Sequence, residues 1–230
     1  MKLIGLIGGT SWPSTFSYYE QLNRAAQKAL GGFHSARILL YSIDYHPIKN
    51  LYHHGWDQIP SLLAGEIRYF LDKKPDCLIL CNNTLHRALD SIRNDLVITV
   101  PIFHAGLLAA EEAQRRGCKK VLLLGTSFTM EDGFFAKYFQ DQGIEVVTPS
   151  AKDRQLIQEI QSELAQGNIN PSFETKFVAL LHHYPDVDAI VLACTELPLI
   201  INDGNSPKPL INTIECQCAA AAKFAFEIEA

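Results

Sequence analysis

Apolar positions along this chain come in continuous blocks rather than in alternation with polar ones. Eight short runs rich in Leu, Ile and Val recur at residues 3–8, 37–44, 76–81, 97–103, 120–126, 144–149, 188–194 and 208–213. Continuous apolar runs are typical of strands buried on both faces, as in a parallel sheet covered by helices. Helix-like stretches separate the runs, at 13–30, 57–73, 105–116, 129–142, 152–166 and 212–228. The pattern therefore predicts an α/β fold.

The chain also repeats itself once. Three segments of the first half match three of the second half in the same order: 7–11 with 123–127, 76–84 with 188–196, and 101–104 with 209–212. Chance similarity between apolar strands is the alternative. The matches predict two pseudo-symmetric α/β domains, each with a mainly parallel central sheet. We expect residues 1–99 and 209–230 to form the first domain and 100–208 the second, with the active site in the cleft between them, at the carboxyl ends of the strands.

Composition and charge narrow the classes of function. With 230 residues, 47% of them hydrophobic, the chain can bury a full core. A net charge of −5 gives no reason to expect nucleic acid or an anionic membrane as partner. No apolar run is long enough to cross a bilayer, and the N-terminus does not resemble a signal peptide. We therefore expect a cytoplasmic protein with reduced cysteines, and the cysteine spacing predicts no metal site.

Two of the matched strands end in small polar residues, Asn82-Asn83-Thr84 after Cys81 and Thr195-Glu196 after Cys194. Backbone N–H groups at such strand ends bind anions and lower the pKa of a thiol, so we expect Cys194 to form a thiolate readily. Removing a proton beside a carboxylate requires a base of this kind. A buried, inert cysteine is the alternative. The residues expected to bind a substrate carboxylate are Thr10, Ser11, Asn83, Thr84 and Thr195.

The N-terminal segment MKLIGLIGGTSWPSTFSYYEQLN resembles the opening of the aspartate/glutamate racemase family. SARILLYSIDY, LLLGTSFTM and CTELPLI resemble later segments of that family, in order and along nearly the whole chain. The resemblance implies an isomerase that acts on an acidic or small polar amino acid without pyridoxal phosphate or any other cofactor, often as a homodimer. In this family two cysteines flank the substrate's α-carbon. One removes its proton as a thiolate, and the other delivers a proton to the opposite face.

By this resemblance, Cys194 matches the second catalytic cysteine. The first is expected immediately before Asn-Thr in a C-N-T-x-H pattern, and aligning Asn83-Thr84 with that pattern places Asn82 in the catalytic position. The internal repeat gives the same pairing of Asn82 with Cys194. Neighbouring strand residues point to opposite faces, so Cys81 is not expected to substitute directly. A shift of one residue that restores Cys81 to the site is the alternative.

Other positions bear on the substrate. Where aspartate-specific members carry a basic residue, this chain has Leu156, although Lys152 or Arg154 can supply the charge from nearby. The segment 51–56, which helps to close the site, contributes Tyr52 as a substrate-binding candidate, and Glu196 is a second one.

Three functions remain open from the sequence. The first is a racemase acting through Cys194 and the Asn82 or Cys81 position, with activity reduced by Asn82. The second is a one-thiol enzyme similar to the decarboxylase branch of the family. The third is a carboxylate-binding protein that has lost turnover.

Overall fold

The computed structural model of the protein describes residues 1–227, so position 228 of the expected C-terminal helix and the last three residues of the expected first domain lie outside it. Contacts divide the chain into two units, Met1–His104 with Gln217–Ala230 (unit 1) and Ala105–Cys216 (unit 2). Both junctions lie a few residues later along the chain than the sequence predicted. Each unit has a parallel sheet covered by helices, which confirms the predicted α/β class.

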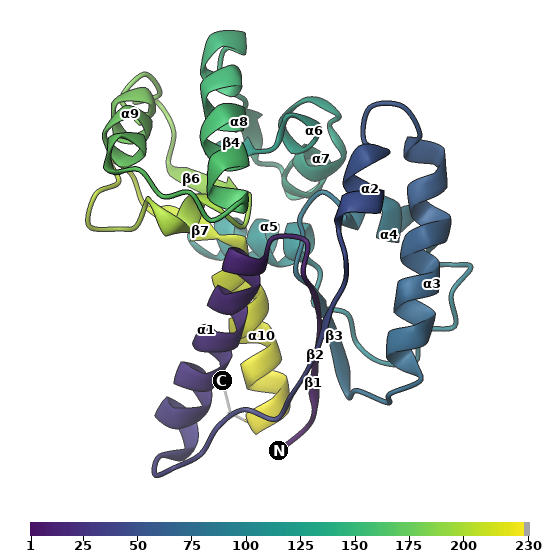
Figure 1. The fold of residues 1–230 in the computed structure, drawn as a ribbon. Helices are drawn as coiled ribbons and strands as arrows, with labels where there is room; N and C mark the ends of the chain where they lie inside the picture. The colour runs from purple at the N-terminus through teal and green to yellow at the C-terminus, as the bar shows by residue number, and fades with distance from the viewer. Residues whose placement is uncertain (228–230) are drawn as a thin grey trace. The chain divides into compact units, whose positions relative to one another are not determined.

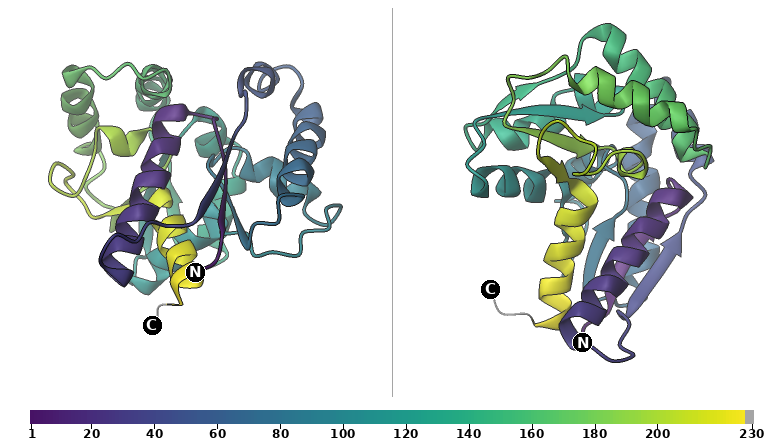
Figure 2. Two further views of the ribbon diagram at one scale, coloured as in Figure 1. Left: turned by 60° about the horizontal axis from the view of Figure 1, so that its bottom comes forward. Right: turned by 90° about the vertical axis from the view of Figure 1, so that its left-hand side faces the viewer.

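Unit 1 is built on a three-stranded parallel sheet in the order β2-β1-β3. Helices α1 and α10 lie on one side of this sheet and α3 and α4 on the other (Figures 1 and 2). The elements are β1 (Ile4–Gly8), α1 (Trp12–Leu30), β2 (Ile38–Ser42), α2 (His46–Asn50), η1 (Trp56–Gln58), α3 (Ile59–Leu71), β3 (Cys77–Leu80) and α4 (His86–Ile92), and α10 (Thr213–Phe226) returns from unit 2.

The strand predicted over 97–103 is reduced to a single bridge between Leu78 and Ile102. Two hydrogen bonds hold this bridge: Leu78 N–H donates to the Pro101 carbonyl at 2.9 Å, and Phe103 N–H donates to the Leu78 carbonyl at 3.0 Å. Pro101 has no N–H of its own, so it restricts this segment to the edge of the sheet.

Unit 2 has a four-stranded parallel sheet in the order β5-β4-β6-β7. Its elements are α5 (Ala105–Arg115), β4 (Lys120–Gly125), α6 (Ser127–Glu131), α7 (Phe134–Gln140), β5 (Glu145–Val147), α8 (Ala151–Ala165), α9 (Pro171–Leu181), β6 (Ala189–Ala193), η2 (Leu197–Leu199) and β7 (Leu210–Asn212). Leu122 and Leu192 pack in one core with α8 and α9, while Leu123 and Val191 pack in another with α5 and α7. Burial on both faces explains the continuous apolar runs.

Two features of the helices differ from the prediction. The helix expected over 129–142 is broken into α6 and α7 at Gly133, whose φ of +87° lies in the left-handed region that favours glycine. In addition, α2, α4 and α9 were not among the helices predicted from the sequence. Helix α9 has its own start signal, because the Asn170 side chain accepts the Ser172 N–H at 2.9 Å and Pro171 occupies the first turn.

The internal repeat is visible in the hydrogen bonds of the two sheets. Asp76 and Asp188 each accept a backbone N–H from the start of the neighbouring strand, from Leu3 at 2.5 Å and from Lys120 at 2.9 Å. Ile190 N–H donates to the Pro209 carbonyl at 2.9 Å, as Leu78 does to Pro101. These equivalent hydrogen bonds agree with the predicted matches of 76–84 with 188–196 and of 101–104 with 209–212.

The predicted match of residues 7–11 with 123–127 is wrong by one residue. Because Leu3 corresponds to Lys120 in these hydrogen bonds, Gly8 rather than Gly9 corresponds to Gly125. Gly9 follows the strand with a φ of +84°, in a turn between β1 and α1. At both matched glycines a threonine side chain packs against the backbone. An added methyl group would lie 2.4 Å from Thr15 at Gly8 and 2.8 Å from Thr129 at Gly125.

Candidate active site

In unit 1, β1 leads into α1 through Gly9, Thr10 and Ser11. The Gly9 N–H donates to the Thr15 hydroxyl at 3.1 Å, and the Thr10 hydroxyl donates to the Cys81 carbonyl at 3.0 Å. These bonds tie the end of β1 to the end of β3. Ser11 precedes the first turn of α1, which holds no acidic residue, and its buried Oγ has no hydrogen-bond partner within the described part of the chain. A helix N-terminus with such a hydroxyl suits a carboxylate.

The end of β3 carries Asn82, Asn83 and Thr84, of which Asn82 is the most exposed. The Asn82 Oδ1 accepts the Leu85 N–H at 2.8 Å, and its Nδ2 lies 3.4 Å from the Tyr45 hydroxyl. The Tyr45 hydroxyl in turn contacts that of Tyr52, which is buried. The structure thus brings Asn82 and Tyr52 into one polar cluster. Tyr45 was missed, although it ends the SARILLYSIDY segment.

Cys81 lies in the core of unit 1. It is fully buried, and burial followed by the proximity of Cys218 raises the pKa of its thiol well above the ordinary value. Cys218 belongs to α10 and contacts the Tyr18 carbonyl of α1. Cys81 is therefore placed among the helices on one side of the sheet, whereas Asn82 contacts the Tyr45 side chain from the loop after β2.

A buried histidine supports the backbone at the end of β3. His86 Nδ1 lies 2.8 Å from the Asn82 carbonyl, and its ring packs edge-on against that of His104, with centroids 4.3 Å apart. His104 Nε2 lies 3.2 Å from Asp90. Burial, and then His104, lower the pKa of His86 from 6.5 to about 3, so His86 is a neutral hydrogen-bonding group near neutral pH.

In unit 2, Cys194 and Glu196 form a contact at the end of β6. The Cys194 thiol donates to Oε2 of Glu196 at 2.8 Å, and both side chains are buried. Glu196 has no cationic partner within residues 1–227. A buried carboxylate without a cation is stabilised by a hydrogen-bond donor, and the thiol provides one. Thr195, between the two, is buried as well.

The expectation of a lowered pKa at Cys194 is wrong. Burial first, and then the Glu196 carboxylate, raise the pKa of this thiol well above its ordinary value. The backbone N–H groups of Glu196 and Leu197 act in the opposite direction but do not outweigh them. The element after β6 is a 3₁₀ turn of only three residues, η2, so the favourable dipole is small. Sequence spacing could not reveal that the glutamate turns back onto the thiol.

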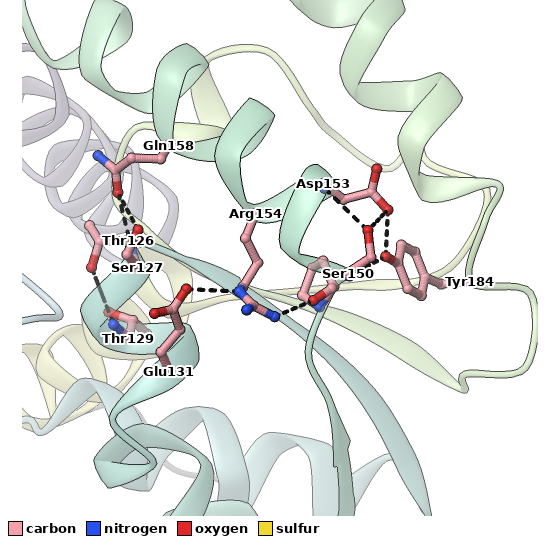
Figure 3. A network of polar contacts seen from close by, with 10 residues as sticks. Thr126, Ser127, Thr129, Glu131, Ser150, Asp153, Arg154, Gln158 and Tyr184 are labelled. Atoms are coloured by element: carbon pink, nitrogen blue, oxygen red, sulfur yellow. Dashed lines mark hydrogen bonds and ion pairs between the residues drawn. The ribbon is translucent and has the colours of Figure 1, made fainter.

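Of the basic residues of α8, Arg154 is held by polar contacts (Figure 3). Arg154 donates to Glu131 at 2.8 Å and to the Pro149 carbonyl at 2.7 Å, while Lys152 is exposed. One turn further along α8, Gln158 accepts the N–H of Ser127, the first residue of α6, at 3.1 Å. Gln158 was missed by the sequence analysis, although it lies four residues after Arg154 and so faces the same side of the helix.

Within residues 1–227, no helix combines the length and apolar character needed to span a bilayer. The same residues contain no cluster of three or more His, Cys, Asp or Glu side chains suited to a metal ion.

Comparison with known proteins gives a consistent result. A family model described as Asp/Glu/Hydantoin racemase matches residues 7–222. The broad specificity amino-acid racemase RacX of Bacillus subtilis (strain 168) is 23% identical over 223 residues, which cover 93% of this chain and 94% of RacX. A candidate Asp/Glu racemase from Yersinia pestis has a solved structure that is 34% identical, with a TM-score of 0.84 over 98% of this chain and 99% of that one. An aspartate racemase homologue from Pyrococcus horikoshii OT3 is 28% identical, with a TM-score of 0.83 and the same coverage.

Proposed function

The chain belongs to the Asp/Glu/Hydantoin racemase family, and from this premise we propose that it is an amino-acid racemase that moves the Cα proton through Cys194. The observation that carries the proposal is the buried thiol at the end of β6, which donates its proton to Glu196 at 2.8 Å. This hydrogen bond places an acceptor for the thiol proton in contact with the thiol, so proton transfer needs no rearrangement of the two side chains.

The proposed reaction begins with transfer of the thiol proton from Cys194 to Glu196. The resulting thiolate is stabilised by the N–H groups of Glu196 and Leu197. It then removes the Cα proton of the bound amino acid, whose electron pair passes into the carboxylate to give an enediolate. A proton returned by the thiol to the same face of Cα restores the starting enantiomer, whereas a proton delivered to the other face gives its mirror image. After return to the same face, the Glu196 proton passes back to Cys194. After inversion, Cys194 keeps the proton that it removed, and the Glu196 proton passes through solvent to the group that protonated the other face.

The second proton-carrying position of the family is occupied by Asn82. A neutral amide cannot carry a proton at ordinary pH, and its oxygen already accepts the Leu85 N–H. We propose that the other face of Cα is protonated by water or by the Tyr45 hydroxyl, which lies 3.4 Å from the Asn82 amide nitrogen. Inversion is then slower than proton exchange.

The substrate carboxylate is assigned to the N-terminus of α1. The support is the buried Ser11 Oγ, which has no hydrogen-bond partner within residues 1–227 and stands at a helix start without acidic side chains. For the substrate side chain, Arg154 is already paired with Glu131. The name of RacX states broad specificity, so we propose testing neutral amino acids beside aspartate and glutamate.

A one-thiol reaction is the second candidate, favoured by Asn82 in the position where the family carries a cysteine. The experiment that tests both is incubation in D₂O with aspartate, glutamate, neutral amino acids of both configurations and a substituted malonate. Deuterium at Cα of an amino acid, lost in Cys194→Ala, supports the racemase. Release of CO₂ from the malonate without Cα exchange would favour the decarboxylase. Binding of an amino acid by calorimetry with neither reaction would show a carboxylate-binding protein.

A further inference from the structure

Three aromatic side chains of unit 1 pack in a row after β2. The rings of Tyr45 and Tyr52 meet edge to face with their centroids 6.0 Å apart, and those of Tyr52 and Trp56 do so at 5.3 Å. The Tyr45 and Tyr52 hydroxyls are in contact, and Tyr52 is buried. Edge-to-face pairs at such separations are a favoured arrangement of aromatic rings. These three residues, here called the aromatic row, therefore pack as one group.

Both ends of the aromatic row meet the short segment that follows β3. At one end, Nδ2 of Asn82 lies 3.4 Å from the Tyr45 hydroxyl. At the other end, the guanidinium carbon of Arg87 lies 4.4 Å from the centroid of the Trp56 ring. Asn82 follows β3 closely, and Arg87 lies in the first turn of α4. The row therefore rests at two points on the turn between β3 and α4.

The turn after β3 is a firm support for these contacts. Oδ1 of Asn82 accepts the Leu85 N–H at 2.8 Å, and the buried His86 ring contacts the Asn82 carbonyl at 2.8 Å. The segment that carries the row has less regular structure, since α2 and η1 span only five and three residues. Its backbone hydrogen bonds, such as that from Tyr52 N–H to the Lys49 carbonyl at 3.2 Å, join residues of this same segment. Side-chain contacts with the turn therefore help to fix where the segment lies.

Arg87 is well suited to the face of Trp56. Indole is the aromatic ring that attracts a cation most strongly, and the flat guanidinium can stack on it. Arg87 and Trp56 are both half-buried, so water weakens their attraction less than at a fully exposed site. Lys49 lies over the Tyr52 ring at 4.7 Å but is exposed. Arg87 is therefore the cation expected to contribute most to holding the row.

We propose that Arg87 is a positioning residue for the substrate site beside Asn82. By capping Trp56, it holds the aromatic row, and with it Tyr45 and Tyr52, against the turn after β3 before an amino acid binds. This role rests on the proposed function, in which Asn82 occupies the second proton-carrying position. A protein whose competent arrangement is only partly populated binds its substrate more weakly in proportion. Loss of the cap should thus weaken binding and leave the chemistry of the bound complex nearly unchanged.

The kinetics of Cα proton exchange in D₂O, with L-aspartate, L-glutamate and L-alanine assayed separately, test this role. We expect Arg87→Gln to raise KM about tenfold and to keep kcat within about twofold of the wild type, because the row must then be ordered as the amino acid binds. Trp56→Leu should give the same result, and it replaces Arg87→Gln should that variant fail to fold. Arg93→Leu is the matched control, since Arg93 is exposed at the other end of α4.

The double variant tests whether the two residues act through one another. If Arg87 acts through Trp56, combining Arg87→Gln with Trp56→Leu should raise KM no further than either change alone. Effects on KM that multiply in the double variant would overturn the proposal. So would a KM of Arg87→Gln equal to that of the Arg93→Leu control, or a fall in kcat with KM unchanged.

The fluorescence of Trp56 gives a second measurement that needs no turnover. Trp12→Phe leaves Trp56 as the single tryptophan of the chain. In this background we expect acrylamide to quench Trp56 more strongly after Arg87→Gln, and saturating L-aspartate or L-alanine to reverse the change. Equal quenching with and without Arg87 would overturn the proposal. A wild type that shows no Cα exchange would instead refute the proposed function, and the quenching would still decide whether Arg87 holds the row.

Discussion

The ends of β3 in unit 1 and β6 in unit 2 occupy matching places in matching sheets but carry different chemistry. When the two sheets are aligned by their strand register, Asn82 corresponds to Cys194 and Cys81 corresponds to Ala193. The Asn82 oxygen accepts the Leu85 N–H and its nitrogen lies beside a tyrosine hydroxyl, whereas the Cys194 thiol donates a hydrogen bond to a carboxylate. The fold has thus duplicated the position of a side chain at a strand end, while only one copy retains a group that can carry a proton.

The comparison also explains Cys81. Its counterpart Ala193 packs in the core formed with α5 and α7, on the opposite side of the sheet from Cys194. Cys81 is fully buried in the same way and lies near Cys218 of α10. Cys81 and its counterpart Ala193 are therefore both core residues, and the Cys81 thiol contributes to packing.

The largest expected effect is that of Cys194→Ala. Loss of the general base should reduce Cα proton exchange by roughly 10²–10⁴-fold. Cys81→Ala is the matched control, because it removes a thiol one residue before the Asn82 position and should lower stability more than activity. The rates of Cα proton exchange in the two variants are compared by NMR in D₂O. Equal loss of exchange in the two variants would place Cys81 in the reaction and contradict the comparison.

Glu196→Gln should have the second-largest effect. We expect it to slow Cα proton exchange on the order of 10²-fold, because an amide cannot accept the thiol proton. The same change removes the negative charge that raises the pKa of Cys194. The thiol should therefore be alkylated faster at a given pH, as measured by mass spectrometry of its peptide. If alkylation speeds up and exchange is unchanged, Glu196 acts on the thiol only through its charge, and the proposed transfer of the thiol proton to Glu196 is wrong.

Asn82→Cys is expected to raise inversion relative to exchange by about tenfold, because it supplies a second proton carrier. Asn82→Ala serves as the control, since both variants lose the bond to the Leu85 N–H, at a cost of about 1 kcal/mol of stability, but only the cysteine can carry a proton. Chiral chromatography of the products gives the inversion rate. The interpretation fails if the two variants invert the substrate equally slowly.

The smallest effect concerns acid stability. The matching position to His86 in unit 2 is Pro198, which does not titrate. The pKa of His86 is lowered from 6.5 to about 3 in the folded protein, so between these pH values the unfolded chain binds more protons. Stability should therefore fall as the pH decreases from 6.5 toward 3, by at most about 1.4 kcal/mol per pH unit.

His86→Gln should make this dependence shallower in urea unfolding measured across that range. Hydrogen exchange should also show amides of unit 1 losing protection before those of unit 2. Identical pH profiles for the variant and the wild type would exclude His86 as the source.

The sequence predicted the sheets well because their strands are buried on both faces, which leaves an unambiguous apolar signature. It failed where a single residue decides the outcome, as at Gly133, which divides one predicted helix. It also did not reveal that the strand predicted over 97–103 pairs through one bridge. The strand ends were also predicted, since small polar residues follow apolar runs there. The raised pKa of Cys194 was not, because it depends on where the Glu196 side chain turns, and spacing carries no information about that.

We propose that Cys194 is the one proton carrier and works without a thiol at the matching position. The most direct test of this proposal is the deuterium content of the unreacted enantiomer recovered early from the wild-type reaction in D₂O. A single carrier returns solvent deuterium to the face from which it removed the proton, so we predict that one recovered enantiomer gains deuterium faster than its mirror image forms. Recovered substrate free of deuterium, with deuterium confined to the inverted product, would show that two groups carry protons and that Cys194 does not act alone.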